Sequence, residues 1–391
     1  MKILWITKTN PFRGKGGEYL YSAGMITALS ENSEVKLVCF ADHNSTKIEQ
    51  NAHSSNTIEI TADLRSDFSS LFSIFPNNSN RYWRPKFRDV VIDLIGEYQP
   101  HAVVIDSLAM AWLISYVEKF RHRASIIYFS HNYETGLRKS IAADRDATWI
   151  ARAIRILDSA KTSRLERKIC READLITAIT RTDLRNYEEQ FPQANCLLLL
   201  PGYTTIPANL RAFPKGRTVC IIGSFLWSTK RSNLLNFLEQ SFDILHQNNI
   251  TLKIIGNIQD EFKQQLLQQY PQLVVTGQVA SIDDASAECR AGLLIDTIGG
   301  GFKLKALDYI FLGLPIFALP GCMHGLDLES ETDFIERRDA RSLVQALADL
   351  ISSENMSQMR IAAFEKSKAK YSWQTSSNAL YNFLQTKQQI E

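Results

Sequence analysis

The sequence lacks several features that would assign it to a special class of protein. Its six cysteines include no C-x-x-C pair and no cluster with histidine at zinc spacing, so we expect reduced core cysteines. A net charge of only +2 argues against a nucleic-acid binder that relies on bulk charge. No run of 18 apolar residues occurs, and the apolar start meets Lys8 and Pro11 too early for a signal-peptide core. We therefore expect a cytoplasmic protein, at most at the inner face of a membrane.

A glycine-rich stretch in the second half of the chain gives the first sign of function. The short apolar run Ala291 to Ile295 predicts a buried strand. Apolar residues at helical spacing from Phe302 to Leu312 predict a helix. The residues between these two elements include Gly299, Gly300 and Gly301.

This order of strand, glycine loop and helix predicts an anion site. Glycines let backbone N–H groups approach an anion closely, and the helix N-terminus adds a partial positive charge. Lys303 and Lys305 add cations, and Asp308 offers acceptor oxygens to vicinal hydroxyls about one turn after Lys305. A phosphate site beside such a carboxylate suits a nucleotide. The alternative is a tight turn with solvated lysines.

The N-terminus repeats the same order of elements. Lys2 to Thr7 predicts a strand, and the glycine-rich loop Asn10 to Gly17 leads into a predicted helix from Glu18 to Glu31. The glycine spacing differs from G-x-G-x-x-G, and the second predicted strand does not end in an acidic residue. NAD binding is therefore disfavoured.

Apolar runs alternate with predicted helices through both halves of the chain, which is typical of parallel sheets. Thr204 to Arg217, rich in proline and small residues, predicts a linker between the halves. His131 and Glu134 follow the predicted strand Ser125 to Phe129. Because ligands of such sheets bind beyond the carboxyl ends of the strands, both are candidate site residues. The alternative for His131 is a polar loop residue that caps the next helix.

Two cations follow the first predicted strand of the second half, Thr218 to Ile222. Lys230 and Arg231 lie between this strand and a predicted helix from Leu234 to Leu245. Two cations near a glycine loop suit a diphosphate. The alternative is a pair of solvated residues at a helix start.

The segment from Arg138 to Arg171 is strongly basic. It holds ten Lys and Arg against four Asp and Glu, and Ile150, Ile154 and Leu157 fall at helical spacing. This pattern predicts a long cationic amphipathic helical region. Such a region is typical of a solvated helix face, and also of a peripheral contact with an anionic membrane.

Taken in order, these motifs resemble the retaining glycosyltransferases of the GT-B fold, particularly the family 4 group. The matching motifs are P-x-x-x-x-G-G from Pro11, H-N-Y-E from His131, G-S-F-L-W with Lys230, and G-G-G-F-K-L-K-A-L-D-Y from Gly299. The resemblance implies two Rossmann-like, doubly wound parallel-sheet α/β domains that face each other across a cleft. Residues 1–203, joined by the C-terminal helix 374–391, would form the acceptor side, and residues 204–373 the donor side.

The resemblance also implies an activity. A hexosyltransferase of polysaccharide biosynthesis would move a sugar from a nucleotide-diphosphate sugar to a glycan, a lipid-linked sugar or a small molecule. It would retain the anomeric configuration and use no metal or other cofactor, the nucleotide sugar being a co-substrate. The alternatives are a nucleotide-sugar epimerase or hydrolase on the same fold, and a catalytically silent nucleotide-sugar-binding subunit.

By the same resemblance, His131 would lie near the transferred sugar and Glu134 would orient it or shape the acceptor side. Lys230 would contact the diphosphate, and Asp308 would occupy the position of the glutamate that holds the ribose. These implied catalytic residues are His131, Glu134 and Lys230. The implied donor-binding residues are Gly16, Gly17, Gly223, Ser224, Lys230, Arg231, Gly299, Gly300, Gly301, Phe302, Lys303, Lys305 and Asp308.

Two positions differ from the family's pattern. The family commonly carries an acidic residue near the position of Gly300, and an arginine often stands where this chain has Ser224. The resemblance therefore assigns more of the phosphate charge to Lys230 and Arg231.

Overall fold

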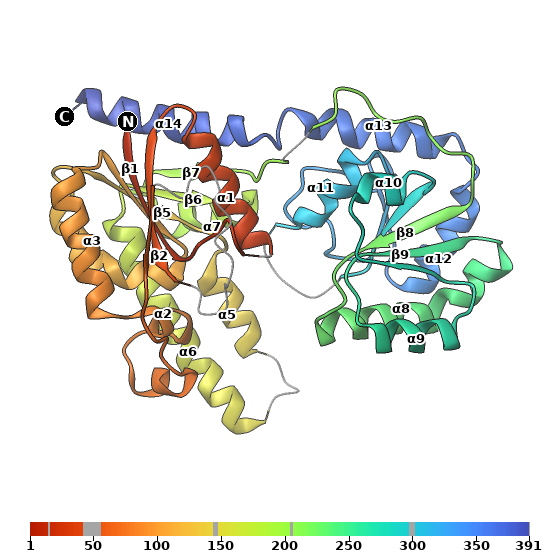
Figure 1. The fold of residues 1–391 in the computed structure, drawn as a ribbon, viewed down its shortest axis with the longest axis horizontal. Helices are drawn as coiled ribbons and strands as arrows, with labels where there is room; N and C mark the ends of the chain where they lie inside the picture. Colours follow the sequence, from red (N-terminus) through yellow and green to blue (C-terminus); the bar gives the residue numbers. More distant parts are fainter. Residues whose placement is uncertain (15, 42–55, 144–147, 204–205, 297–301, 391) are drawn as a thin grey trace. The chain divides into compact units, whose positions relative to one another are not determined.

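The computed structural model describes residues 1–14, 16–41, 56–143, 148–203, 206–296 and 302–390 (Figure 1). The chain divides into two compact units. The first combines Met1–Thr204 with Ser372–Glu391, and the second is Thr205–Tyr371. Each unit has one sheet, and all the strand pairs in the described residues are parallel. The predicted pair of Rossmann-like parallel-sheet domains is thus confirmed.

The first unit is built on a seven-stranded sheet in the order β3-β2-β1-β4-β5-β6-β7. The central strands are apolar throughout because both faces of a parallel sheet are covered, and Ile3 to Ile6 in β1 are completely buried. The strands are β1 (Lys2–Thr9), β2 (Glu34–Phe40), β3 (Thr57–Ile60), β4 (Ala102–Asp106), β5 (Ser125–Phe129), β6 (Leu175–Ala178) and β7 (Cys196–Leu198).

The helices of the first unit include the last helix of the chain. That helix packs against the first one, and its Ser376 donates a hydrogen bond of 2.6 Å to the carbonyl of Leu200. The helical segments are α1 (Gly17–Leu29), η2 (Asp67–Phe72), α2 (Asn77–Tyr82), α3 (Pro85–Tyr98), η3 (Leu108–Leu113), α4 (Ile114–Val117), η4 (Glu118–Phe120), α5 (Glu134–Ala142), α6 (Trp149–Glu172), α7 (Arg181–Gln190) and α14 (Trp373–Ile390).

The second unit has a six-stranded sheet in the order β10-β9-β8-β11-β12-β13. Its strands are β8 (Thr218–Ile222), β9 (Thr251–Ile255), β10 (Val274–Gly277), β11 (Ala291–Leu294), β12 (Ile316–Ala318) and β13 (Ile335–Glu336). Its helices are α8 (Ser228–Gln247), α9 (Asp260–Gln269), α10 (Ile282–Ser286), α11 (Leu304–Phe311), α12 (Ala340–Leu350) and α13 (Asn355–Lys368).

In both sheets the direction of winding reverses beside the first strand of the unit. The reversal lies between β1 and β4 in the first sheet and between β8 and β11 in the second. Connections leave in opposite directions at such a point, which opens a crevice beyond the carboxyl ends of the two strands. The topology therefore names one candidate ligand position in each unit.

Some local expectations are confirmed and others need correction. Helix α11 forms within the predicted span Phe302 to Leu312, and Gly313 after it takes φ 67°, the left-handed conformation that ends many helices. Helix α8 begins at Ser228, six residues earlier than predicted, so Lys230 and Arg231 belong to its first turn. The predicted apolar face of the basic segment is not buried at its start, because Ile150 and Ile154 are exposed.

Two further features of the described residues are the state of the cysteines and the character of the helices. All six cysteines are free, and five of them are buried. Among the described helices, none combines the length and the apolar character that crossing a membrane requires.

Candidate functional site

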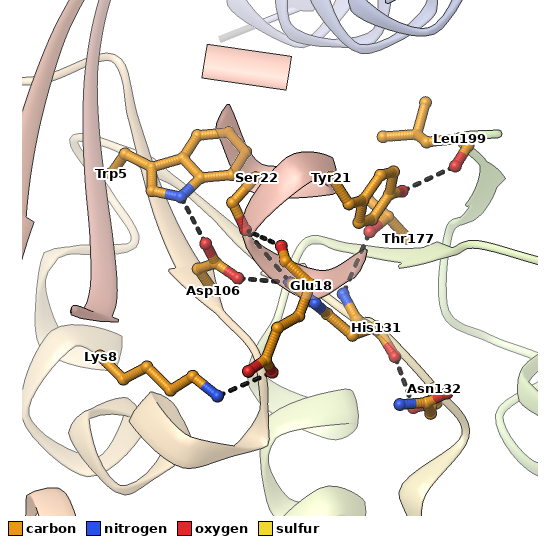
Figure 2. A network of polar contacts seen from close by, with 11 residues as sticks. Trp5, Lys8, Glu18, Tyr21, Ser22, Asp106, His131, Asn132, Thr177 and Leu199 are labelled. Carbon is orange, nitrogen blue, oxygen red and sulfur yellow. Dashed lines mark hydrogen bonds and ion pairs between the residues drawn. The ribbon is translucent and has the colours of Figure 1, made fainter. Parts of the chain in front are cut away.

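In the first unit, a buried carboxylate lies at the point where the sheet reverses. Asp106 is the last residue of β4, and its side chain is 1% exposed. It accepts hydrogen bonds from the indole of Trp5 on β1, at 2.8 Å, and from Nε2 of His131 after β5, at 2.6 Å. Figure 2 shows Asp106 between these two rings. One carboxylate therefore links β1, β4 and the segment that follows β5.

These contacts fix the ring of His131. Its edges contact Tyr21 and Phe129, with ring centroids 5.4 and 5.6 Å apart and the rings nearly perpendicular. Nε2 donates to Asp106, while Nδ1 is buried and has no hydrogen-bond partner in the described part of the chain. Burial alone would raise the pKa of Asp106, but His131 and the hydrogen bonds hold that pKa below its ordinary value. The ring thus keeps Nδ1 for another partner.

A small pocket opens beside this pair. One of its residues, Ser107, has φ 67°. Residues other than glycine rarely adopt this backbone conformation, and those that do are often found at functional sites. The Ser107 hydroxyl is buried and, like His131 Nδ1, lacks a partner among the described residues. Both residues line the pocket, and two polar atoms without partners beside it suit a ligand rich in hydroxyl groups. The lining residues are Thr7, Lys8, Pro11, Glu18, Tyr19, Ser22, Asp106, Ser107 and His131.

The glycine loop of the first unit leads into Glu18 and Tyr19, which line the same pocket. Gly16 takes φ 139° and ψ 166°, a region open almost only to glycine, and Gly17 begins α1 without a side-chain cap. Lys8 forms a 2.7 Å ion pair with Glu18 in the first turn. Burial would lower the pKa of Lys8, but the Glu18 carboxylate raises it above its ordinary value. Lys8 therefore stays charged beside the pocket.

A second buried carboxylate holds the segment that follows His131. Glu166 on α6 is 1% exposed and accepts hydrogen bonds from the backbone of Glu134, at 3.0 Å, and of Thr135, at 2.7 Å. The hydroxyl of Tyr187 donates a third, at 2.9 Å. Helix α5 has no side-chain cap of its own at Tyr133, so Glu166 satisfies its first N–H groups. Burial raises the pKa of Glu166 to about 6.

The side chain of Glu134 is 13% exposed and lies near this network. Burial raises the pKa of its carboxyl group, although Arg138, at 3.6 Å, acts in the opposite direction. Its Oε2 is buried and makes no hydrogen bond within the described residues. Glu134 is thus a carboxyl group poised to accept a hydrogen bond.

In the second unit, a lysine and an aspartate meet where the sheet reverses. Lys230, in the first turn of α8, forms an ion pair with Asp296, which follows β11. Arg231 turns another way: it donates a 2.5 Å hydrogen bond to Gln259 and lies over the ring of Phe262. Lys230, rather than Arg231, therefore occupies the switch point between β8 and β11.

Two further lysines lie near this pair. Lys305 donates a 2.9 Å hydrogen bond to the carbonyl of Ile222, the last residue of β8. Burial lowers its pKa, and the charges of Asp308 and Asp296 act in the opposite direction. Burial also lowers the pKa of Lys303. Partly desolvated ammonium groups gain most from an incoming anion, so the cluster suits a phosphate group.

Glycines allow close backbone contact at the same edge. Gly256 takes φ 129°, and a Cβ there would lie 1.9 Å from the carbonyl oxygen of Gly223. A Cβ on Gly223 would in turn lie 3.6 Å from Nζ of Lys305. Ser224, which is partly buried, follows Gly223, while Phe302 contacts Tyr371 at 5.5 Å between ring centroids. The predicted Gly299, Gly300 and Gly301 lie outside the described residues.

The structure adds four residues that the sequence reasoning missed: Asp106, Ser107, Glu166 and Asp296. Two of them could have been found, because Asp106 and Asp296 stand at or just after the end of a buried apolar strand, as His131 does. Glu166 gave no such signal, since it is one acidic residue within a basic helix.

Comparison with known proteins agrees with this geometry. Residues 216–353, within the second unit, match the protein family described as Glycosyl transferases group 1. No curated protein gives a significant match. The family match and the fold together support a glycosyltransferase of the GT-B type.

Several solved structures share the fold over nearly the whole chain. Alr3699/HepE of Anabaena, in complex with UDP and glucose, is 13% identical with a TM-score of 0.64, over 99% of this chain and 100% of that one. The lipopolysaccharide outer core galactosyltransferase WaaB is 14% identical with a TM-score of 0.63, over 99% and 100%. TarM of S. aureus is 11% identical with a TM-score of 0.66, over 98% of each chain. At such low identity the likeness establishes the fold.

Asp106→Asn should release His131 from a single tautomer. The wild-type carboxylate only accepts, so a neutral ring keeps its proton on Nε2, whereas an asparagine amide can also donate and admits the other form. Nitrogen NMR of histidine-labelled protein in alkaline buffer reports the tautomer. Ser22→Ala, which removes a hydroxyl 3.4 Å from the same nitrogen, is the control and should change nothing. A wild-type ring protonated on Nδ1 would contradict this account.

Glu166→Gln should remove a pH dependence of stability. Because the native pKa is about 6 and the ordinary value is 4.5, the native state binds the proton more readily than the unfolded chain. The free energy of unfolding therefore falls by about 2 kcal/mol as pH rises from 4.5 past 6, and glutamine cannot titrate.

Urea unfolding at pH 4.5 and 6.5, followed by tryptophan fluorescence, measures this difference. Glu189→Gln, at an exposed position, is the matched control and should keep the wild-type difference in free energy of unfolding between the two pH values. If Glu166→Gln showed the same difference as wild type, Glu166 would not be the source of the pH dependence of stability.

Proposed function

We propose that this chain is a glycosyltransferase that moves a sugar from a nucleotide-diphosphate sugar to an acceptor hydroxyl. The observation that carries the proposal is the set of lysines at the switch point of the second sheet: Lys230, Lys303 and Lys305. They lie in the part of the chain that matches Glycosyl transferases group 1. HepE of Anabaena, which shares the fold, was solved with UDP and glucose, and this supports a nucleotide sugar as the donor.

The lysines would serve the leaving group. A diphosphate that enters the site competes with Asp296 for Lys230 and adds negative charge near the partly buried Lys303 and Lys305. As the bond to the sugar breaks, negative charge grows on the diphosphate, and fixed cations stabilise it more strongly than water does. Asp308 would accept hydrogen bonds from the ribose hydroxyls. Under this proposal, protein cations do the work that a metal ion does in other transferases.

The pocket of the first unit would serve the sugar and the acceptor. A neutral His131 can accept a hydroxyl hydrogen at Nδ1, and the Ser107 hydroxyl can donate or accept. Glu134 would orient the transferred sugar or shape the acceptor side. We propose that transfer retains the anomeric configuration, with attack on the face from which the diphosphate leaves. The acceptor would be a glycan, a lipid-linked sugar or a small molecule.

One experiment separates this function from its rivals. A thermal-shift screen of UDP-, GDP- and dTDP-sugars first identifies the donor, because stabilisation grows with the ratio of ligand concentration to dissociation constant. Release of nucleoside diphosphate that requires an acceptor supports the transferase. Release without an acceptor indicates a hydrolase, conversion of the donor into an isomer indicates an epimerase, and binding without turnover indicates a silent subunit.

Lys230→Ala should lower transfer about 100-fold, the usual effect of removing one charge-stabilising group from an active site. Release of nucleoside diphosphate under donor saturation measures the loss. The control is Lys215→Ala, which removes an exposed lysine of the same unit and should leave turnover unchanged. Turnover equal to wild type in a folded Lys230→Ala protein would exclude the proposed role.

Chelation should leave the reaction unchanged, since the proposal assigns the leaving-group charge to lysines. The enzyme is treated with excess EDTA, passed through a desalting column and assayed at donor saturation. We expect a rate within twofold of the untreated enzyme. A loss that added Mg²⁺ or Mn²⁺ restores would contradict metal independence and leave the donor assignment intact.

A further inference from the structure

A tyrosine side chain joins two strands that separate at the switch point of the second unit. Among the described residues, the last pair between β8 and β11 is Cys220 with Gly292, whereas β8 stays paired with β9 as far as Ile222, its last residue. Strands β8 and β11 therefore part before their carboxyl ends. The hydroxyl of Tyr309 on α11 bridges them at this point.

The Tyr309 hydroxyl takes the place of the strand pairing that ends here. It accepts a hydrogen bond from the backbone N–H of Ile222, at 2.7 Å, and donates one to the carbonyl of Leu293, at 3.1 Å. Tyr309 is completely buried, and burial raises the pKa of its hydroxyl well above the ordinary value, so the hydroxyl keeps the proton that it donates. A buried backbone N–H needs such a partner, because leaving it unpaired destabilises the fold.

A glycine in β11 makes room for the tyrosine ring. Gly292 is the second residue of this strand, and a Cβ at position 292 would lie 1.9 Å from Cδ1 of Tyr309. Glycine inside a strand often marks a place where another part of the chain approaches closely. Any other residue at position 292 would displace the ring, so Gly292 and Tyr309 form a matched pair.

Tyr309 shares a face of α11 with a lysine of the candidate donor site. Lys305 stands four residues earlier, and its Nζ donates a 2.9 Å hydrogen bond to the carbonyl of Ile222. Side chains of α11 thus bind both backbone groups of Ile222. Gly223 follows Ile222 in the chain, and Asp308 precedes Tyr309. The two side chains therefore fix α11 against the end of β8, where residues assigned to the donor begin.

We propose that Tyr309 is a positioning residue for the diphosphate of the donor. Its hydroxyl holds the end of β8 against α11, so that Lys305 and the backbone at Gly223 meet the phosphate oxygens in a fixed geometry. Because Tyr309 is completely buried, it acts through these two residues and not by direct contact with the donor. The inference rests on the proposed function, since it takes the anion at Lys305 to be a diphosphate.

Tyr309→Phe keeps the ring and removes only the hydroxyl. We expect the KM of the nucleotide sugar to rise about tenfold, while kcat and the KM of the acceptor stay within about threefold of wild type, because the diphosphate is bound in both the ground state and the transition state. A purely structural role would lower the amount of active enzyme, and hence kcat, without changing the donor KM.

Tyr270→Phe is the matched control. It removes the hydroxyl of another buried tyrosine of the second unit, which accepts a 3.2 Å hydrogen bond from Gln269. We expect this variant to keep the wild-type kcat and donor KM.

Two measurements test the inference without an acceptor. In calorimetric titrations, the tightest binder among UDP, GDP and dTDP should bind Tyr309→Phe about tenfold more weakly than wild type. Without nucleotide, hydrogen exchange of the peptide that contains Ile222, followed by mass spectrometry, should be faster in Tyr309→Phe than in wild type or Tyr270→Phe.

Either of two results in Tyr309→Phe would overturn the inference: wild-type nucleotide affinity, or wild-type exchange in the peptide that contains Ile222. Both concern the variant and leave the proposed function intact. A wild-type protein that binds none of the three nucleotides would instead contradict the proposed function, and with it the inference that rests on it.

Discussion

The reversal of winding in each sheet is the constraint on which both candidate sites depend. A parallel sheet covered on both faces has apolar strands, so polar side chains can gather only where the strands end. The point between β1 and β4, or between β8 and β11, is where neighbouring connections part and leave room for a ligand. Asp106 and Asp296 stand at equivalent places in the two units, at the end of β4 or just after β11. Asp106 binds Trp5 on β1 and His131 after β5, while Asp296 binds Lys230 after β8.

The two carboxylates differ in what surrounds them, and this decides their roles. Asp106 is fully enclosed, and its partners Trp5 and His131 are held by packing, so it can fix a ring but cannot exchange partners. Asp296 is 25% exposed and Lys230 is 39% exposed, so their ion pair can open when a stronger anion arrives. A solvated ion pair costs little to break. The first unit thus offers a rigid recognition group, and the second an exchangeable charge.

Much of the fold follows from the sequence, because continuous apolar runs of strand length indicate buried strands in a chain of this composition. The start of α8 does not follow from the sequence, because its first turn is polar and tertiary packing, rather than periodicity, extends the helix. His131 could be predicted as a site residue because it follows β5. The same rule, that ligands bind beyond the carboxyl ends of the strands, yields Asp106 and Asp296 when it is applied to every strand. The role of Glu166 could not be predicted from the sequence. Only folding brings its carboxylate to the N-terminus of α5, and nothing in a basic helix marks one acidic residue as buried.

The basic helix also shows how one periodic pattern can mislead. Leu165 and Ile169 are buried in the core, while Ile150 and Ile154, at helical spacing on the same helix, are exposed to solvent. A period of 3.6 residues indicates which side chains share a face of a helix, but it does not indicate what covers that face. The stripe is therefore one feature with two environments along α6. Its buried half anchors the helix and places Glu166 beneath α5, and its exposed half is held outward by that anchor.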